Sequence, residues 1–332
     1  MKRGLIASVL LLVCICSVAG WYLYQFFTTP GSALARPVIV FVRKGMTLHE
    51  TARQLVSAGL LSHAQPFIWW ARFTGADRQI KSGEYLFTTP LSPLALLHTL
   101  TKGEGLRHVV TITEGMTLRQ VSALLAAQGL GTEENFLCLD TDPAFLAAWG
   151  LPPQGIEGYL YPDTYHFSWL ASPEEILGHM VERFYAVLSP SMHRRAVTLD
   201  LSMHQVITLA SIIEKETGTP SERPLVAAVF HNRLRKGMPL QSDPTVIYGI
   251  THFDGNLTRQ HLLTPTPYNT YLFRGLPPRP IANPGLETIV AALHPAERDY
   301  LYFVAKGDGS HVFSSDLNTH NRAVHRFQRG RS

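Results

Sequence analysis

Cysteine is scarce in this sequence. The 332 residues include three cysteines, and two of them, Cys14 and Cys16, lie in a long apolar run near the N-terminus. Cys138 is therefore the only thiol in the rest of the chain, where a lone cysteine cannot form an intrachain disulfide. We expect packing alone to stabilise this part. The whole chain, with 332 residues of which 45% are hydrophobic, is long enough for about two domains.

Runs of like charge are also absent. The chain carries 29 Lys and Arg against 25 Asp and Glu, a net charge of +4, and its basic residues are scattered. A nucleic-acid-binding surface usually needs clustered basic side chains. We therefore expect no nucleic-acid partner, and any polymer bound here should be held by hydrogen bonds and aromatic side chains.

Motifs for metals and cofactors are missing as well. The 15 histidines include no H-E-x-x-H pattern, no C-x-x-C accompanies them, and His311, His320 and His325 lack a carboxylate-rich partner pattern for zinc. There is no glycine-rich phosphate loop and no G-x-S-x-G elbow. We expect no metal and no cofactor, which leaves chemistry performed by carboxylic acids.

One long apolar run is present at the N-terminus. Residues 5–27 carry no charge and are long enough to cross a bilayer as a helix. Lys2 and Arg3 precede the run, so the positive-inside rule places residues 1–4 in the cytoplasm and the chain after the run outside it. The alternative is a cleaved signal peptide, but the apolar run continues to Phe27, beyond the small residues 17–19, which favours a retained anchor.

A sequence repeat follows a linker-like stretch at residues 28–37. "VRKGMTLHETARQLVSAGLL" at 42–61 recurs as "ITEGMTLRQVSALLAAQGLG" at 112–131. Each copy has a strand-like lead-in, then Gly-Met-Thr-Leu, then an amphipathic helix. We interpret residues 38–184 as a duplicated β/α region.

The helix starts in both copies carry the same capping signal. Thr47 and Thr117 are each followed three residues later by Glu50 or Gln120, which predicts a capping box. A short strand–G-x-T-L–helix unit resembles the LysM-type modules that bind N-acetylated glycans. The alternative is a spacer that projects the C-terminal part away from the membrane.

A predicted helical hairpin contains the strongest candidate chemistry. Its first helix starts at Ser202 with Gln205 in a capping box and ends at 217–218, and a second helix runs from Pro224 in its first turn to a stop at Gly237. The stretch "IIEKETGTPSER", residues 212–223, joins the two helices. In it the apolar run of the first helix stops and two glutamates, Glu214 and Glu216, follow.

Glu214 and Glu216 both flank the apolar face of the first helix, while Lys215 lies opposite, at 100° per residue. Burial raises the pKa of a carboxyl group, which is how a glutamate becomes a general acid near neutral pH. The alternative is ion pairing with a basic residue of the second helix, namely Arg223, Arg233 or Arg235. Helix geometry does not choose between the two glutamates.

Three long segments resemble the YceG-like family of murein transglycosylases. They are "LASIIEKETGTPSERPLVAAVFHNRLRKGMPLQSDPTVIYG", "TPYNTYLFRGLPPRPIANPG" and "YLYFVAKGDGSHVFSSDLNTHN". The resemblance covers essentially the whole chain, the N-terminal half by layout more than by identity. It implies an α+β fold with a single transmembrane helix at 5–27, a LysM-like region at 38–184 and a mixed α/β catalytic domain at 185–332.

The resemblance also implies a reaction. Such enzymes cleave the β-1,4 bond between N-acetylmuramic acid and N-acetylglucosamine without water, using one glutamate as acid and then base. By its position in "S-I-I-E-K-E", that glutamate is Glu214. The alternatives are a hydrolytic muramidase with Asp243 as the second carboxylate and a non-catalytic murein-binding scaffold.

Further residues are expected to bind the glycan. Glu216 would support the catalytic glutamate. The polar side chains expected to bond N-acetyl and hydroxyl groups are Asn232, Gln241, Ser242 and Asp243, and the tyrosines expected to stack on sugar faces are Tyr248, Tyr268 and Tyr271. Asn269 and Thr270 are expected to contribute from the long loop 264–285.

The implied partners are peptidoglycan glycan strands and, as a family-level expectation, the membrane machinery of peptidoglycan synthesis. The implied location is the bacterial inner membrane, with one span and a periplasmic catalytic domain.

Overall fold

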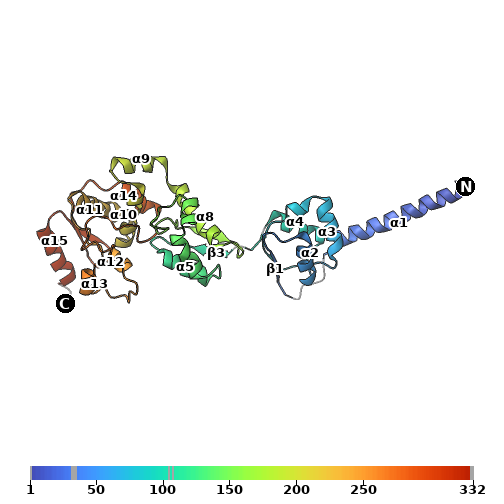
Figure 1. Ribbon diagram of the computed structural model, residues 1–332, viewed down its shortest axis with the longest axis horizontal. Coiled ribbons are helices and arrows are strands. Elements are labelled where there is room, and N and C mark those ends of the chain that lie inside the picture. The colour runs from blue at the N-terminus through green and yellow to red at the C-terminus, as the bar shows by residue number, and fades with distance from the viewer. Residues whose placement is uncertain (1, 31–35, 104, 107, 330–332) are drawn as a thin grey trace. The chain divides into compact units, whose positions relative to one another are not determined.

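The computed structural model describes residues 2–30, 36–103, 105–106 and 108–329. It combines helices with short strands, as expected for an α+β protein (Figure 1). Parts of four predicted segments lie outside the described residues: residue 1 of the N-terminal stretch, 31–35 of the linker, 104 and 107 of the duplicated region, and 330–332 of the C-terminal domain. The chain divides into two compact units, residues 1–108 with 166–171, and residues 109–165 with 172–332.

The apolar N-terminal run is a helix, α1 (Lys2–Thr28). Its segment Leu10–Thr28 has a mean hydropathy of 1.8 and is long enough to cross a membrane. Near its end, Phe27 is buried against Trp70, with ring centroids 4.9 Å apart. Length and composition thus fit the predicted anchor, and Phe27 connects α1 to the folded part of the first unit.

The first unit is built on a two-stranded antiparallel sheet. Strand β1 (Val38–Val42) pairs with β2 (Gly83–Phe87), with Val40 opposite Tyr85. The helices of this unit are α2 (Leu48–Ser57), α3 (Ala64–Phe73), η1 (Ala76–Arg78) and α4 (Pro93–Lys102). Buried side chains from the sheet and the helices, among them Leu55, Phe67 and Leu96, form one core.

The second unit is mostly helical. Its longer helices are α5 (Leu118–Ala127), α6 (Glu133–Leu137), α7 (Pro143–Ala148), α8 (Pro173–Val187), α9 (Pro190–Thr198), α10 (Met203–Glu216), α11 (Arg223–Arg235), α12 (Asp243–Tyr248), α13 (Arg259–Leu263), α14 (Leu286–Leu293) and α15 (Leu317–Val324). Short helical turns are η2 (Cys138–Thr141), η3 (Pro220–Glu222) and η4 (His325–Arg329). Strand β3 (His108–Thr111) pairs with β4 (Thr164–Phe167), and residues 109–111 and 164–165 of these strands belong to this unit. Strand β5 (Tyr302–Ala305) pairs with β6 (His311–Ser314).

Helices α10, α11 and α14 form the centre of this unit (Figure 1). Eight consecutive residues of α10, from Val206 to Ile213, are buried, so this helix is surrounded on most sides. Its predicted capping box at Ser202 and Gln205 is present, as are the two boxes of the repeat. The predicted hairpin of α10 and α11 is confirmed. Strands β5 and β6 form an antiparallel hairpin as well.

The two copies of the repeat belong to different units. The predicted boundary between residues 184 and 185 falls inside α8, within the second unit. The reason is a set of backbone hydrogen bonds: Gly115 N donates to Asn283 O, and Asn283 N donates to Met116 O, both at 2.9 Å. The turn of the second copy is thereby fixed to the chain just before α14, so residues 109–165 fold with the C-terminal part.

Candidate functional site

The C-terminal end of α10 opens onto a cavity of about 650 Å³ in the second unit. Three segments line the cavity: strand β3 with the turn after it, the chain before and at the start of β4, and the end of α10 with its connection to α11. The lining residues are Thr111, Ile112, Thr113, Glu114, Pro162, Asp163, Thr164, Glu214, Thr217, Gly218 and Arg223. Of the two glutamates that helix geometry left equivalent, Glu214 is the one that lines this cavity.

The Glu214 carboxylate is held at the start of α14. Its Oε2 accepts hydrogen bonds from Gly285 N at 2.9 Å and from Thr288 Oγ1 at 2.6 Å, and Gly285 is the N-cap of that helix. The N-terminus of a helix presents free N–H groups and a partial positive charge to such a carboxylate. The side chain is only 7% exposed, so its orientation is fixed by these donors.

Arg223 stands among three carboxylates. Its Nη2 lies 3.7 Å from Glu214 Oε1 and 3.3 Å from Glu114 Oε2, and its Nη1 lies 2.5 Å from Glu287 Oε2. The guanidinium is 9% exposed. One of the ion pairs that the sequence offered as the alternative for Glu214 is therefore present, and it lies at the wall of the cavity.

Glu114 contributes a second carboxylate to the cavity. Its partial burial, followed by repulsion from Glu214, raises the pKa of Glu114 above its usual range despite the nearby Arg223. Neighbouring Gly115 accepts a hydrogen bond from Lys215 Nζ at 3.2 Å. Lys215 is exposed, as predicted, yet it helps to fix the turn that carries Glu114.

Sequence reasoning missed Glu114, although a signal was present. At this position the repeat has Lys44 in its first copy and Glu114 in its second, while the following Gly-Met-Thr-Leu is unchanged. A charge reversal inside an otherwise repeated turn indicates a different environment. Thr288 and Gly285 carried no comparable signal.

Glu216 belongs to a different cluster. Its Oε1 accepts a hydrogen bond from Ser242 Oγ at 2.5 Å. Burial, with a smaller contribution from Asp243, raises the pKa of Glu216 to about 7. Asp243 in turn accepts a hydrogen bond from Tyr271 Oη at 2.6 Å. The structure thus brings together the predicted residues Glu216, Ser242, Asp243 and Tyr271.

Three other predicted residues are buried and bonded to protein. The amide of Asn232 donates to the carbonyls of Arg298 and Tyr300, and the amide of Asn269 donates to those of Leu262 and Thr264. Thr270 Oγ1 accepts from Ser242 N at 3.0 Å. Asn269 and Thr270 fix the loop that leads to Tyr271 and Ser242, whereas Asn232 fixes the chain at 298–300. Contact of these side chains with a sugar stays a prediction.

The predicted residue Gln241 is exposed and strained. Its φ of 51° is in the left-handed region, which non-glycine residues seldom occupy. Its Oε1 accepts from Arg233 Nη1 at 3.3 Å, and Arg233 also donates to Leu240 O at 2.7 Å. Arg233 therefore holds the backbone at the point where the strained residue occurs.

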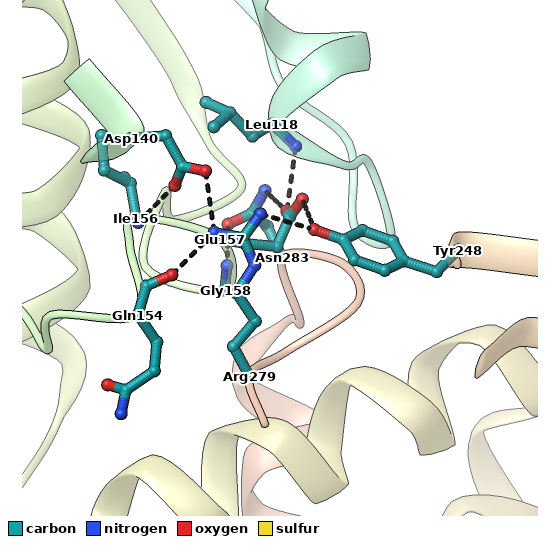
Figure 2. Close-up of polar contacts among 9 residues, drawn as sticks. All are labelled: Leu118, Asp140, Gln154, Ile156, Glu157, Gly158, Tyr248, Arg279 and Asn283. Carbon is teal, nitrogen blue, oxygen red and sulfur yellow. Dashed lines mark hydrogen bonds and ion pairs between the residues drawn. The ribbon is translucent and has the colours of Figure 1, made fainter. Parts of the chain in front are cut away.

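Figure 2 shows a third buried carboxylate, Glu157, which sequence reasoning also missed. Its Oε1 accepts from Leu118 N at 2.9 Å and from Asn283 Nδ2 at 3.3 Å, and its Oε2 accepts from Tyr248 Oη at 3.0 Å. Burial raises the pKa of Glu157 to about 7. The flanking Gly158, at a φ of 91°, was the available signal of close packing.

Tyr248 and Tyr268 were predicted to stack on sugars, and Tyr248 is the one bonded to this carboxylate. Their rings are 4.8 Å apart in an edge-to-face arrangement. Tyr248 Oη also accepts from Arg279 Nη2 at 3.1 Å, and Arg279 Nη1 lies 2.7 Å from Asp140 Oδ2. The hydroxyl of Tyr248 therefore donates to Glu157 and accepts from Arg279 within a buried polar network (Figure 2).

Within the described part of the chain, no group of three or more His, Cys, Asp or Glu side chains is arranged to hold a metal ion. The carboxylates near Glu214 converge on an arginine instead.

Comparison with known proteins places these residues in a family context. The model of the YceG-like family matches residues 40–326. An endolytic murein transglycosylase of Bacillus subtilis is 30% identical over 337 residues, covering 93% of this chain and 91% of the relative. An endolytic murein transglycosylase of Streptococcus pneumoniae is 28% identical over 97% of this chain, which spans 65% of that relative's length.

A solved structure is similar too. The crystal structure of a YceG-like protein from Listeria monocytogenes has a TM-score of 0.60 and 30% sequence identity, covering 86% of this chain and 98% of the other.

The titration of Glu157 predicts how stability depends on pH. Because its pKa is raised in the folded protein, its contribution to stability is full below about pH 4.5 and is lost as pH rises through about 7. Glu157→Gln keeps the shape and removes the titration. Between pH 5 and 8 the wild type should lose up to about 3 kcal/mol more unfolding free energy than this variant.

Urea unfolding of the full chain in detergent at both pH values measures this difference. Glu50→Gln is the control, because Glu50 is exposed and its pKa is lowered by its capping contacts with Thr47. An unchanged pH dependence in Glu157→Gln would contradict the assignment.

Proposed function

Because the chain belongs to the YceG-like family, we propose that it is an endolytic lytic transglycosylase of peptidoglycan. It cleaves the β-1,4 bond between N-acetylmuramic acid and N-acetylglucosamine within glycan strands and leaves 1,6-anhydro ends, so that nascent strands are terminated or trimmed. The observation that supports this most directly is the placement of Glu214, in the family's "S-I-I-E-K-E" stretch, at the wall of the 650 Å³ cavity.

Glu214 performs both proton transfers in this proposal. Its Oε2 already accepts two hydrogen bonds, so the transferable proton is carried by Oε1. Oε1 gives that proton to the glycosidic oxygen as the C1–O bond breaks. The resulting carboxylate then takes the proton of the muramic acid C6 hydroxyl, whose oxygen attacks C1. Glu214 ends protonated, as it began, and no water is consumed.

The charge balance around Glu214 suits this reaction. Three carboxylates surround one guanidinium at Arg223, so the cluster is negative overall when all are ionised. Positive charge develops on the sugar ring as the glycosidic bond breaks. Fixed negative charge at the cavity wall stabilises that transition state more than the neutral substrate.

The remaining parts have proposed roles around this centre. Helix α1 is the single-pass inner-membrane anchor, with residues 1–4 cytoplasmic and the catalytic part periplasmic. The catalytic part comprises residues 185–332 together with residues 109–165, which carry Glu114. The part of the duplicated region 38–184 that lies in the first unit, with the first copy of the repeat, acts as a LysM-like glycan binder or as a spacer. A pocket of about 230 Å³ in the first unit, partly lined by Arg43 and Ser82, supports glycan binding there.

Substitution of the two glutamates tests the catalytic assignment. Glu214→Gln keeps a similar shape but cannot transfer a proton, so formation of anhydro ends should fall by ~10³-fold or more. Glu216→Gln alters one hydrogen bond in a neighbouring cluster, and the loss should stay within about 10-fold. Digestion of uncrosslinked glycan strands, followed by mass spectrometry of the products, measures both. A Glu214→Gln protein that still forms anhydro ends would contradict the assignment of Glu214 as the catalytic acid and base.

The same products separate the alternative functions. A muramidase that uses a second carboxylate adds water, so its fragments are heavier than anhydro fragments by one water molecule. A non-catalytic scaffold retains glycan and releases no fragments. Either result from the wild-type chain would replace the proposal.

Glu114 is expected to act through charge. Glu114→Gln removes one negative charge from the cavity and should lower kcat by about 10-fold, with a smaller change in KM. Gly285→Ala should act in the same direction, because an added Cβ would overlap Glu114 Oε1, whereas the backbone at Gly285, with φ −76°, accepts alanine. Glu287→Gln is the matched control and should lower kcat less, because Glu287 is not among the residues that line the cavity and water screens its charge on a side chain that is 72% exposed. A normal kcat in both Glu114→Gln and Gly285→Ala would exclude this role.

A further inference from the structure

Helix α3 exposes large aromatic side chains. Trp69 is 64% exposed and Phe73 is 84% exposed, whereas Phe67 and Ile68 on the opposite side of the helix are buried in the core. Exposed aromatic rings that lie close together commonly mark an interaction site. We call Trp69, Phe73 and the adjoining ring of Trp70 the α3 aromatic face.

The α3 aromatic face is continuous with the end of α1. The ring of Trp70 lies 4.9 Å from that of Phe27 and 6.1 Å from that of Phe73. Two ring-to-ring steps therefore connect the apolar helix to Phe73. Figure 1 shows α3 beside the C-terminal end of α1.

The length of the apolar segment places this face at a defined depth. The uncharged run 5–27 contains 23 residues, which at the rise of an α-helix extend over roughly 34 Å. The hydrocarbon core of a bilayer is about 30 Å thick. Phe27 then lies at its outer boundary, and Trp69 and Phe73 lie at the level of the headgroups, where tryptophan is favoured.

The charge of the first unit suits the same surface. Residues 36–103 contain eight Lys and Arg against three Asp and Glu, a net charge of +5, which exceeds the +4 of the whole chain. Arg72 is exposed on α3 between Trp69 and Phe73. Basic residues beside aromatic ones are the usual composition of a segment that rests on anionic lipid.

We propose that the α3 aromatic face is a bilayer-binding surface, with Trp69 and Phe73 inserted among the headgroups of the membrane that holds α1. The proposal rests on the membrane anchorage of α1. Two contacts with the bilayer, the α1 span and α3, would then fix the orientation of the first unit. The span alone would leave the unit free to rotate about it. The partner of the α3 aromatic face is an anionic phospholipid surface.

Site-specific labelling of the full chain tests this proposal. In a chain without its three native cysteines, Phe73→Cys is labelled with an environment-sensitive fluorophore and reconstituted in phosphatidylglycerol–phosphatidylethanolamine vesicles. Val197→Cys is the matched control, because Val197 is 77% exposed on α9 of the second unit. A chain that keeps only Cys14 reports whether α1 has inserted.

The label at residue 73 should be quenched by lipids with a headgroup-level nitroxide, and iodide should quench it at least about threefold less than the label at 197. Adding Trp69→Ser should increase iodide access at 73, whereas adding Trp169→Ser, which removes an exposed tryptophan elsewhere in the unit, should not. Both results together support bilayer contact.

Equal iodide access at 73 and 197, with the Cys14 label buried in lipid, would overturn the proposal and leave the anchor intact. Protection from iodide without nitroxide quenching would overturn it in favour of a protein contact. An iodide-accessible Cys14 label would remove both the anchor and the proposal. Transglycosylase activity on soluble glycan strands is independent of all three readings.

Discussion

The side-chain amide of Asn283 is the interaction on which the candidate site depends. Its Oδ1 accepts from Gly158 N at 3.0 Å and from Leu160 N at 2.9 Å, and its Nδ2 donates to Met116 O at 2.9 Å. Three segments far apart in the sequence therefore meet at one buried group. Two residues later, Gly285 N donates to Glu214, so the position of the carboxylate follows from the same network. Loss of one buried partner would leave several polar groups unpaired, which is costly.

The unit separates three acidic groups by giving each a different set of partners. Glu214 is held by donors at a helix start and faces Arg223, whereas Glu216 bonds to a serine hydroxyl and Glu157 is buried among neutral donors. Burial raises the pKa of both Glu157 and Glu216 to about 7. A carboxyl group whose pKa is raised by burial need not be the catalytic one. Of these three glutamates, Glu214 is the one that lines the cavity, and this is why we propose it as the catalytic residue.

Local features of the fold could be predicted from the sequence, because short-range patterns determine them. The capping boxes at Thr47, Thr117 and Ser202 and the hairpin of α10 with α11 depend on residues close in the chain. The partners of Glu157 could not be predicted, since Asn283 is 126 residues away from it. The helical wheel also left Glu214 and Glu216 equivalent, because it describes one helix and says nothing of what packs around it.

The two copies of the repeat have the same local structure but belong to different compact units, so their similarity alone did not predict where the chain divides. Both copies form a capped helix after the same Gly-Met-Thr-Leu turn, and the second turn is hydrogen-bonded to Asn283 within its own unit. The residue before that turn is Lys44 in one copy and Glu114 in the other, and Glu114 contacts Arg223 at the cavity wall. A duplicated unit can keep its local structure while one copy becomes part of the candidate site and the other stays in the unit of the apolar helix α1. Divergence in charge between the copies is therefore a better guide to their roles than their shared fold.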